Sequence, residues 1–393
     1  YKTLGKAFFL YLDKNENYFP STVKDKEYPK TFFSQEDLLH PGFLVGIIFL
    51  FGLLLRLSLW LIWNPVISRD SIHYLQMAED FSAGQWKKGL AGPYPPLYPF
   101  VISFFLKLKI SLVIAGRLAS LLGYCLSFFS LYFLFQNLRK SWVLPSLLLL
   151  AIHPYHLRYS IMVLSESLYL GFFMAGISLF FLALFHKRYS LLPFSSLMIL
   201  LAYLTRPEGL LPLLLFFPFL LVLPNWKGRE KVKAFLFLLL PFLFLGFPYL
   251  LYLKKRPVPG LPHSAKAWKI TQKGGLYQGL QGTLLQKNPR TGLYQWELSY
   301  SSLWAFSKIW LKRWILSFFR LFEIGHPLFI FLALLSLAYL VNKETLQDSF
   351  ILYFILFFWI LIFCQLSLFA IARLSSRLVF QSGIIALFLS PLG

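Results

Sequence analysis

Residues 42–81 read GFLVGIIFLFGLLLRLSLWLIWNPVISRDSIHYLQMAEDF, and this stretch indicates the class of fold. Residues 42–63 are apolar apart from Arg56 and one serine, and about 20 apolar residues are what a helix needs to cross the hydrocarbon core of a bilayer. Asn64 and Pro65 then end the helix, and a polar segment follows. The stretch predicts a membrane span that leads into a segment at the membrane surface.

The composition of the whole chain extends this prediction to a membrane protein. Hydrophobic residues make up 58% of the 393 residues and charged residues 14%, whereas a soluble domain is about 45–50% apolar and about 25% charged. A soluble enzyme, a secreted disulfide scaffold and a disordered chain are therefore excluded. Lys and Arg outnumber Asp and Glu by 38 to 16, a net charge of +22, but they lie in loops between apolar runs. Anionic lipid headgroups or a phosphorylated lipid are thus favoured over nucleic acid as partners.

The apolar runs predict an all-α, polytopic membrane helix bundle of about ten spans. The predicted spans are residues 42–63, 111–135, 142–157, 166–185, 190–205, 209–224, 234–253, 325–341, 349–370 and 378–391. Several of them are short or contain proline. The two cysteines lie inside these runs and are interpreted as small buried hydrophobes.

The short basic loops predict how the bundle is oriented. Three such loops, at residues 139–140, 187–188 and 227–233, fall on one side together with both ends of the chain, and short basic loops stay cytoplasmic. We therefore expect a multi-pass protein of the cell (inner) membrane. Its predicted parts are a cytoplasmic N-terminal segment at 1–41 and a transmembrane domain at 42–393, with long outer loops at 64–110 and 254–323.

The first outer loop contains two predicted interfacial helices. In DSIHYLQMAEDF an apolar residue recurs every third position, which is typical of a short helix lying on a membrane; these residues are Ile72, Leu75, Ala78 and Phe81. Residues 95–109, PPLYPFVISFFLKLK, begin with a proline pair that starts helices well and end in lysines. This second stretch is too short to predict a span.

Charged residues at the predicted outer interface are the candidates for chemistry, because charges there are costly and tend to be functional. Asp70 stands at the mouth of the first span, where it is either a helix cap or a catalytic acid. His73 can share its helix face, although a lone histidine there also fits a surface position. Glu166 begins the fourth span, where the helix dipole alone would favour a carboxylate.

Basic residues at span ends can bind phosphate or lipid headgroups. Arg206 lies in YLTRPEGLL, where it can also pair with Glu208 in a tight turn. Arg373 and Arg377 flank the last span and either snorkel to headgroups or hold a phosphate. Arg56 and Arg117, inside predicted spans, are expected to snorkel or to pair structurally. The sequence has no Gly-rich phosphate loop, HExxH or CxxC pair, so nucleotide hydrolysis and zinc chemistry lack support.

Read in order, several motifs resemble one family. SRDSIHYLQMAEDF, GPYPPLYPF, LSESLYLGFF and LAYLTRPEGLL are similar to segments of the bacterial family 39 glycosyltransferases of the GT-C superfamily. These are relatives of the dolichyl-phosphate-mannose protein mannosyltransferases and the lipid A aminoarabinose transferase. PYLLYLKKRP, AWKITQKGG and RLSSRLVF resemble later segments, so the resemblance covers roughly residues 42–393.

The resemblance implies a GT-C-like transmembrane catalytic domain at 42–393 that takes sugar from a polyprenyl-phosphate donor in an outward-facing cavity. The family's first outer-loop acid matches Asp70, and the acid at its next outer turn matches Glu166. Its donor-phosphate contacts include basic residues of outer loops, which Arg377 or Arg206 would match. In the aminoarabinose transferases an acidic–basic pair before the Pro-Pro contacts metal and phosphate. Here Tyr94 and Pro95 occupy those places, so no cofactor is assigned and a divalent cation is left open.

The chemistry fits these residues on physical grounds as well. A polyprenyl-phosphate sugar carries its own leaving group, and a fixed carboxylate that takes the proton of an acceptor hydroxyl accelerates transfer by roughly 10²–10⁴. Arginine stabilises the charge that develops on the phosphate, and Lys269 of the long outer loop can close over it with Lys266 and Lys273. A single base on the acceptor side predicts direct displacement with inversion. The acceptor is left open among lipid, glycan and protein.

Two other classes of protein are alternatives. A secondary transporter or lipid flippase would show paired repeats and broken helices with charges at mid-membrane, whereas here the acids gather at one interface. A membrane O-acyltransferase would need a catalytic histidine in an apolar cavity, and no convincing one is present. A membrane glycosyltransferase is the function that the sequence favours.

Overall fold

The computed structural model describes a large part of the chain. The described residues are 41–65, 67–222, 226–255, 283–287, 294–298, 307, 310–312, 314–319, 334 and 349–372.

Long apolar helices dominate the structure, which confirms the predicted all-α membrane helix bundle. Within the described residues, four stretches are long and apolar enough to cross a membrane: Gly42–Trp63, Leu112–Leu138, Ser165–Phe185 and Gly228–Tyr252. They correspond to α3 (Pro41–Trp63), α7 (Leu112–Leu138), α10 (Glu166–Phe185) and the run from α13 (Gly228–Pro241) through the π-helical turn η3 (Phe242–Gly246) into α14 (Phe247–Lys255). Further apolar helices are α8 (Val143–Ile152), α11 (Leu191–Thr205), α12 (Leu211–Val222) and α19 (Ser349–Ala372).

Two predicted spans differ from the helices observed. The predicted span 142–157 is broken at His153, where α8 ends and α9 (Pro154–Ile161) begins, because a residue before proline is driven out of the helical region. The predicted span 234–253 begins earlier, at Gly228, where the Glu230 carboxylate accepts a hydrogen bond from the Lys227 amide at 2.8 Å. The predicted spans 325–341 and 378–391 lie outside the described residues, apart from Leu334.

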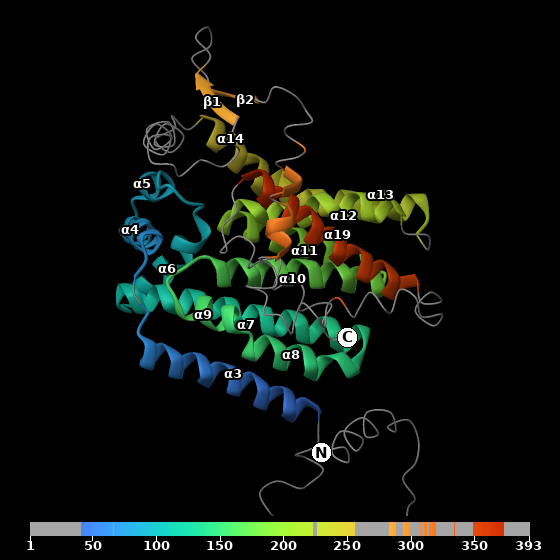
Figure 1. Ribbon diagram of the computed structural model, residues 1–393, viewed down its shortest axis with the longest axis horizontal. Coiled ribbons are helices and arrows are strands. Elements are labelled where there is room, and N and C mark those ends of the chain that lie inside the picture. Colours follow the sequence, from blue (N-terminus) through green and yellow to red (C-terminus); the bar gives the residue numbers. More distant parts are fainter. Residues whose placement is uncertain are drawn as a thin grey trace, which may run out of the picture.

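The centre of the bundle is α10, which packs between α7 and α11 (Figure 1). Glycines allow the close approach, since a Cβ on Gly123 of α7 would collide with the backbone of Ser167, and one on Gly171 of α10 would meet the Gly123 carbonyl at 2.8 Å. Phenylalanine rings attach α12 and α19 to the other end of α10; the closest pair, Phe180 and Phe216, stack with centroids 3.8 Å apart. The core is therefore a tight α7–α10–α11 layer with a phenylalanine cluster beside it.

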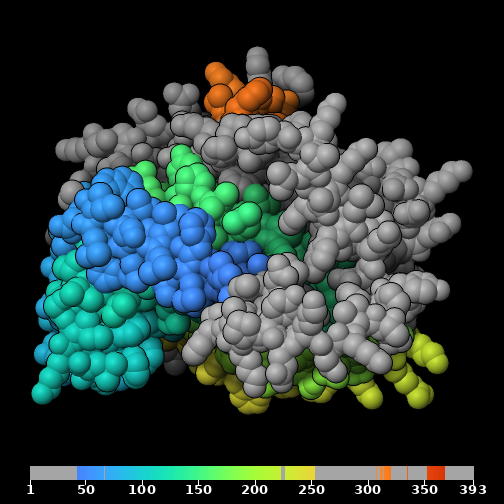
Figure 2. Space-filling model, turned by 90° about the horizontal axis from the view of Figure 1, so that it is seen from below, coloured from blue at the N-terminus to red at the C-terminus, as the bar shows by residue number. Residues whose placement is uncertain are grey.

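Helix α3 lies on the outside of this layer and turns most of its apolar surface outward. Figure 2 shows the face of the molecule that α3 crosses; α3 is blue because it begins the described part of the chain. Its exposed side chains are large and apolar; they include Ile47, Leu50, Phe51, Leu54, Leu61 and Ile62. An apolar face of this kind is what a lipid-facing helix presents.

Arg56 of α3 is fully buried and joins α3 to the break between α8 and α9. Its guanidinium donates hydrogen bonds to Gly52 O at 2.8 Å, Ala151 O at 3.1 Å, Leu150 O at 3.4 Å and Ser160 Oγ at 2.9 Å, and lies 3.0 Å from His156 Nδ1. The Leu150 and Ala151 carbonyls end α8, where a cation is favoured by the helix dipole. The expected structural pairing of Arg56 is thus confirmed.

The segment after α3 folds as three helices at one end of the bundle, α4 (Arg69–Ser82), α5 (Trp86–Leu90) and α6 (Leu97–Lys107) (Figure 1). Both helices predicted in the first outer loop are thus present. The expected stripe on α4 is buried at Leu75, Ala78 and Phe81 but is wrong at Ile72, which is 49% exposed. Tyr74 and Met77, outside the expected stripe, are buried as well. Packing against α6, α5 and α7 selects this face.

Among the described residues of the long loop 254–323, a pair of strands and the helical residues 310–312 and 314–319 were not predicted from the sequence. Strand β1 (Thr283–Lys287) pairs antiparallel with β2 (Tyr294–Leu298), with Thr283 opposite Leu298 and Lys287 opposite Tyr294.

Candidate active site

Hydroxyl groups hold the loop that leads into α10. They come from α4 and α7: Ser71 Oγ donates to Val163 O at 2.7 Å, Ser120 Oγ donates to Leu164 O at 3.1 Å, and the Tyr74 hydroxyl lies 3.0 Å from Ser165 Oγ. These contacts fix the start of α10 against α4. The positions of Glu166 and of the first turn of α4 therefore depend on each other.

Asp70 lies in the first turn of α4 and is half-buried. The Tyr94 hydroxyl donates a 2.6 Å hydrogen bond to Asp70 Oδ1. The cap of α4 is Ser68, whose Oγ accepts from the Ser71 amide at 3.2 Å. The alternative in which Asp70 serves as the helix cap is therefore wrong, and the carboxylate faces Tyr94 instead.

His73, the other candidate on α4, is half-buried beside the same tyrosine. Its ring centroid lies 6.0 Å from that of Tyr94, and the Tyr94 ring lies 4.7 Å from that of Tyr74. The three rings form an aromatic wall next to Asp70.

Glu166 is fully buried at the start of α10, where Arg206 pairs with it. Arg206 Nη1 lies 3.0 Å from Glu166 Oε1, and Arg206 Nη2 lies 3.2 Å from Glu208 Oε1. Arg206 ends α11, and Glu208 lies in the 3₁₀ turn η2 (Pro207–Leu210) that begins α12. The expected pairing of Arg206 with Glu208 is confirmed; the second pair, with Glu166, was not predicted.

The two carboxylates keep Arg206 charged. Burial disfavours its charged form, but Glu166 and Glu208 outweigh burial and raise the pKa of Arg206 above its usual range. Because the cluster contains two carboxylates and one guanidinium, it has a net charge of −1 when all three are ionised.

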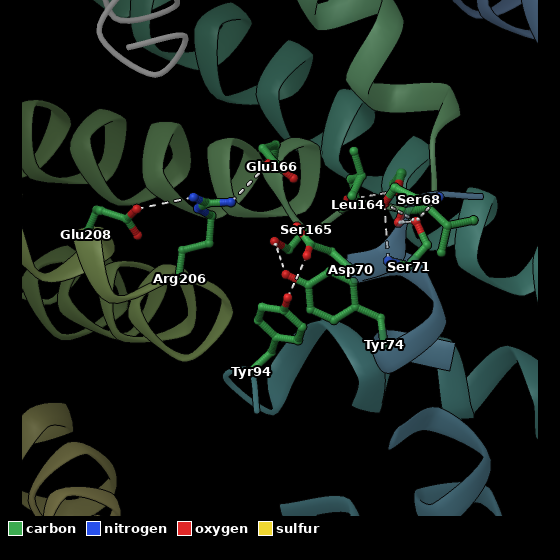
Figure 3. Close-up of polar contacts among 12 residues, drawn as sticks. Ser68, Asp70, Ser71, Tyr74, Tyr94, Leu164, Ser165, Glu166, Arg206 and Glu208 are labelled. Carbon is green, nitrogen blue, oxygen red and sulfur yellow. Dashed lines mark hydrogen bonds and ion pairs between the residues drawn. The ribbon is translucent and has the colours of Figure 1, made fainter. Parts of the chain in front are cut away.

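Asp70 and the Glu166–Arg206–Glu208 cluster lie near each other (Figure 3). Tyr74 lies one turn after Asp70 on α4, and its hydroxyl contacts Ser165, the residue before Glu166. The sequence predicted Asp70 and Glu166 at the same end of the bundle but gave no sign that Tyr74 links them. Arg373, Arg377 and Lys269 lie outside the described residues.

The short basic loops lie at the other end of the bundle. Arg206 lies just before α12, whereas Lys231 Nζ donates to Leu221 O near its end, at 2.6 Å. Twelve helical residues separate the two ends by about 18 Å. At that far end His186 Nε2 also lies 2.9 Å from Asn137 Oδ1, joining the last turns of α7 and α10.

A metal site was left open by the sequence. In the part of the chain that the structure describes, no group of three or more His, Cys, Asp and Glu side chains could hold a metal ion. The described site residues are carboxylates, one guanidinium and phenol hydroxyls, which can accept a proton, hold a charge and bind hydroxyl groups.

Comparison with known proteins agrees with the motifs. The pattern of the dolichyl-phosphate-mannose-protein mannosyltransferase family matches residues 93–252, which include Tyr94, Glu166, Arg206 and Glu208. No curated protein matches the chain. The match covers less than half of the chain and begins after Asp70. Over residues 93–252 the chain has the pattern of a membrane glycosyltransferase of the GT-C type, and the resemblance that the motifs indicated is confirmed for this segment.

Proposed function

We propose that this protein transfers a sugar from a polyprenyl-phosphate donor to an acceptor hydroxyl on the extracytoplasmic side of the cell membrane, with inversion at the sugar carbon. The observation that carries the proposal is the pairing of Asp70 with Tyr94 beside the buried Glu166–Arg206–Glu208 cluster, all at the end of the bundle away from the short basic loops.

Asp70 is the proposed general base. A carboxylate that takes the proton of the acceptor hydroxyl makes that oxygen a better nucleophile as it attacks the sugar carbon. The bond from the sugar carbon to the phosphate oxygen breaks on the opposite face, so one displacement inverts the configuration. Tyr94 orients the base by its hydrogen bond to Oδ1. His73, beside the Tyr94 ring, is proposed to line the same wall.

The buried cluster supports this site from the side of α10. Glu166 begins α10 directly after the loop that Tyr74 contacts, so its ion pair with Arg206 ties α10, α11 and η2 to the wall formed by α4. Arg377, Arg373 and Lys269 are proposed to hold the donor phosphate. That Arg206 also binds this phosphate stays a prediction; its ion pairs with two carboxylates favour a supporting role.

The side of the membrane follows from the charge of the loops. Basic residues of short loops stay cytoplasmic, and residues 227–233 lie at the end of α12 opposite to Arg206. The proposed site then faces outward, where a lipid-linked sugar would supply the leaving group without a nucleotide. The acceptor class is a lipid, a glycan or a protein.

Proteoliposomes test the proposal. Purified protein is reconstituted with a panel of radiolabelled polyprenyl-phosphate hexoses and pentoses, and membrane lipid, glycan and protein fractions are offered as acceptors. We expect transfer from at least one donor, with the anomeric configuration of the product opposite to that of the donor. Retained configuration would contradict the single displacement, and transfer only from nucleotide sugars would contradict the donor class.

A further inference from the structure

Three buried polar atoms near Glu166 have no hydrogen-bond partner. They are the Tyr169 hydroxyl, Arg206 Nε and Glu208 Oε2, none of which is paired anywhere in the described chain. Buried polar groups in native proteins are nearly always bonded, and leaving one unpaired is destabilising. Three such atoms close together therefore indicate a binding place for another polar group.

The three atoms come from elements that the ion pairs hold in place. Tyr169 is fully buried on α10, three residues after Glu166 and so on the same helix face. It lies close enough to Glu208 and Arg206 to experience the charges of both. Because the Nη atoms of Arg206 already bind Glu166 and Glu208, its Nε–H is the donor that remains.

The chemistry of these atoms matches a hydroxyl group better than a phosphate. Nε–H only donates, the carboxylate oxygen only accepts, and the tyrosine hydroxyl does both. A sugar hydroxyl can accept from the guanidinium and donate to the carboxylate at once. A phosphate can only accept from this set, and the net charge of −1 of the two carboxylates and one guanidinium would repel it.

We propose that Tyr169, Arg206 and Glu208 form a subsite for the hydroxyl groups of a neutral sugar ring. The inference rests on the proposed function and assigns this part of the site to sugar, with the phosphate held elsewhere. The sugar belongs to the donor or to a glycan acceptor, and both present the same hydroxyl chemistry. The tyrosine rings at positions 74 and 94 supply an aromatic wall nearby.

Tyr169→Phe is the sharpest test, because it removes a hydroxyl that bonds nothing else in the described structure. The unliganded variant should be as stable as the original protein or more stable, since an unpaired buried group is lost. Its sugar binding should nevertheless weaken about two- to tenfold. Glu208→Gln should weaken sugar binding about tenfold or more, because bonds to charged groups are stronger. Tyr124→Phe, in the same core but bonded to Phe49 O at 3.4 Å, is the matched control.

The probes are a panel of methyl glycosides of hexoses and pentoses, and undecaprenyl phosphate without sugar. Affinities for the detergent-solubilised full chain are taken from the thermal shift as a function of probe concentration. The Tyr124→Phe variant corrects for the general stabilisation that concentrated sugars give. We expect at least one glycoside to bind, with the losses stated above, while undecaprenyl phosphate binds all variants equally.

Several outcomes would overturn the proposal. The original protein would bind none of the glycosides, or Tyr169→Phe and Glu208→Gln would bind them as tightly as the original protein does. The third outcome is that the two variants lose affinity for undecaprenyl phosphate and not for the glycoside. Transfer kinetics then identify the source, since Tyr169→Phe raises KM for the donor or for the acceptor. If Tyr169→Phe and Glu208→Gln both transfer sugar normally, the subsite is refuted and the proposed function is not. If the protein binds a glycoside but transfers sugar from no polyprenyl-phosphate donor, the proposed function is refuted.

Discussion

The ion pair between Glu166 and Arg206 should contribute strongly to stability, because both side chains are withdrawn from water. Their side chains are 0% and 12% exposed, and their atoms lie 3.0 Å apart. Arg206→Met keeps the length of the side chain but leaves the Glu166 carboxylate buried without its cation. Removing one partner of a buried pair costs about 3–5 kcal/mol of unfolding free energy.

The double variant Glu166→Gln with Arg206→Met separates the pair from its surroundings. With both charges gone, the Glu166 carboxylate is no longer buried beside a missing cation, so the part of the loss that belongs to this pair should be recovered; replacing a buried pair by neutral side chains is often nearly neutral. The loss of the second ion pair, from Arg206 to Glu208, remains in the double variant. The two single variants and the double variant form a cycle whose coupling energy we expect to exceed about 2 kcal/mol.

The assay is reversible unfolding of the detergent-solubilised protein. Lys88→Met is the control, since it breaks the 2.6 Å ion pair with Asp80 at the surface, where Lys88 is 69% exposed. An exposed pair is worth about 1 kcal/mol or less. If Arg206→Met destabilises the protein no more than Lys88→Met does, Glu166 does not depend on Arg206 to stay buried as a carboxylate.

Four further outcomes are expected. Tyr94→Phe removes the hydrogen bond to Asp70 and should lower turnover about tenfold, because the carboxylate loses the donor that orients it. Unchanged turnover would leave Tyr94 a packing role only. Arg56→Met should cost about 3 kcal/mol or more of stability, since several buried acceptors, including the last carbonyls of α8, lose their donor. A loss below about 1 kcal/mol in thermal unfolding would contradict the role of Arg56 in joining α3 to α8. Ser68→Ala should cost about 1 kcal/mol through the lost cap of α4, whereas Ser68→Asp should not. The stabilising charge of Arg206 should be insensitive to pH between about 6 and 10, because its folded-state pKa is raised above an unfolded-state pKa that already lies above this range. Its contribution to stability is therefore complete throughout. A loss of stability in this range that the original protein shows and Arg206→Met does not would contradict this.

The sequence predicted the class of fold and the end of the bundle on which the acids lie. The length and spacing of the apolar runs predicted the residue bounds of α3, α7, α10 and α19 to within a few residues, because the thickness of a bilayer constrains helix length. Asp70 was found because a charge directly after a span is conspicuous. Its environment could not be predicted, since Tyr94 lies 24 residues away and meets it only when α4 packs on α6.

Contacts between helices account for what the sequence analysis missed. The ion pair between Glu166 and Arg206 depends on the packing of α10 against α11. Glycine allows this close packing, but a glycine in an apolar run does not show which helix it will contact. Ile72 fits the three-residue pattern and is nonetheless exposed, because the face that α4 packs against its neighbours is centred on Tyr74, Ala78 and Phe81. The role of Ser68 as a cap could have been recognised, since a serine directly before a helical pattern is a start signal. Tyr169 carries no such signal in an apolar span.

Asp70 is proposed to take the proton of the acceptor hydroxyl, and the single-turnover rate of sugar transfer measures this step. Asp70→Asn keeps the size of the side chain and the helix, because Ser68 caps α4, and Asp80→Asn on the same helix is the matched control. We expect Asp70→Asn to lower the rate about 10²-fold or more with donor binding nearly intact, and Asp80→Asn to change it little. A near-normal rate in Asp70→Asn, or an equal loss in both variants, would contradict this role of Asp70.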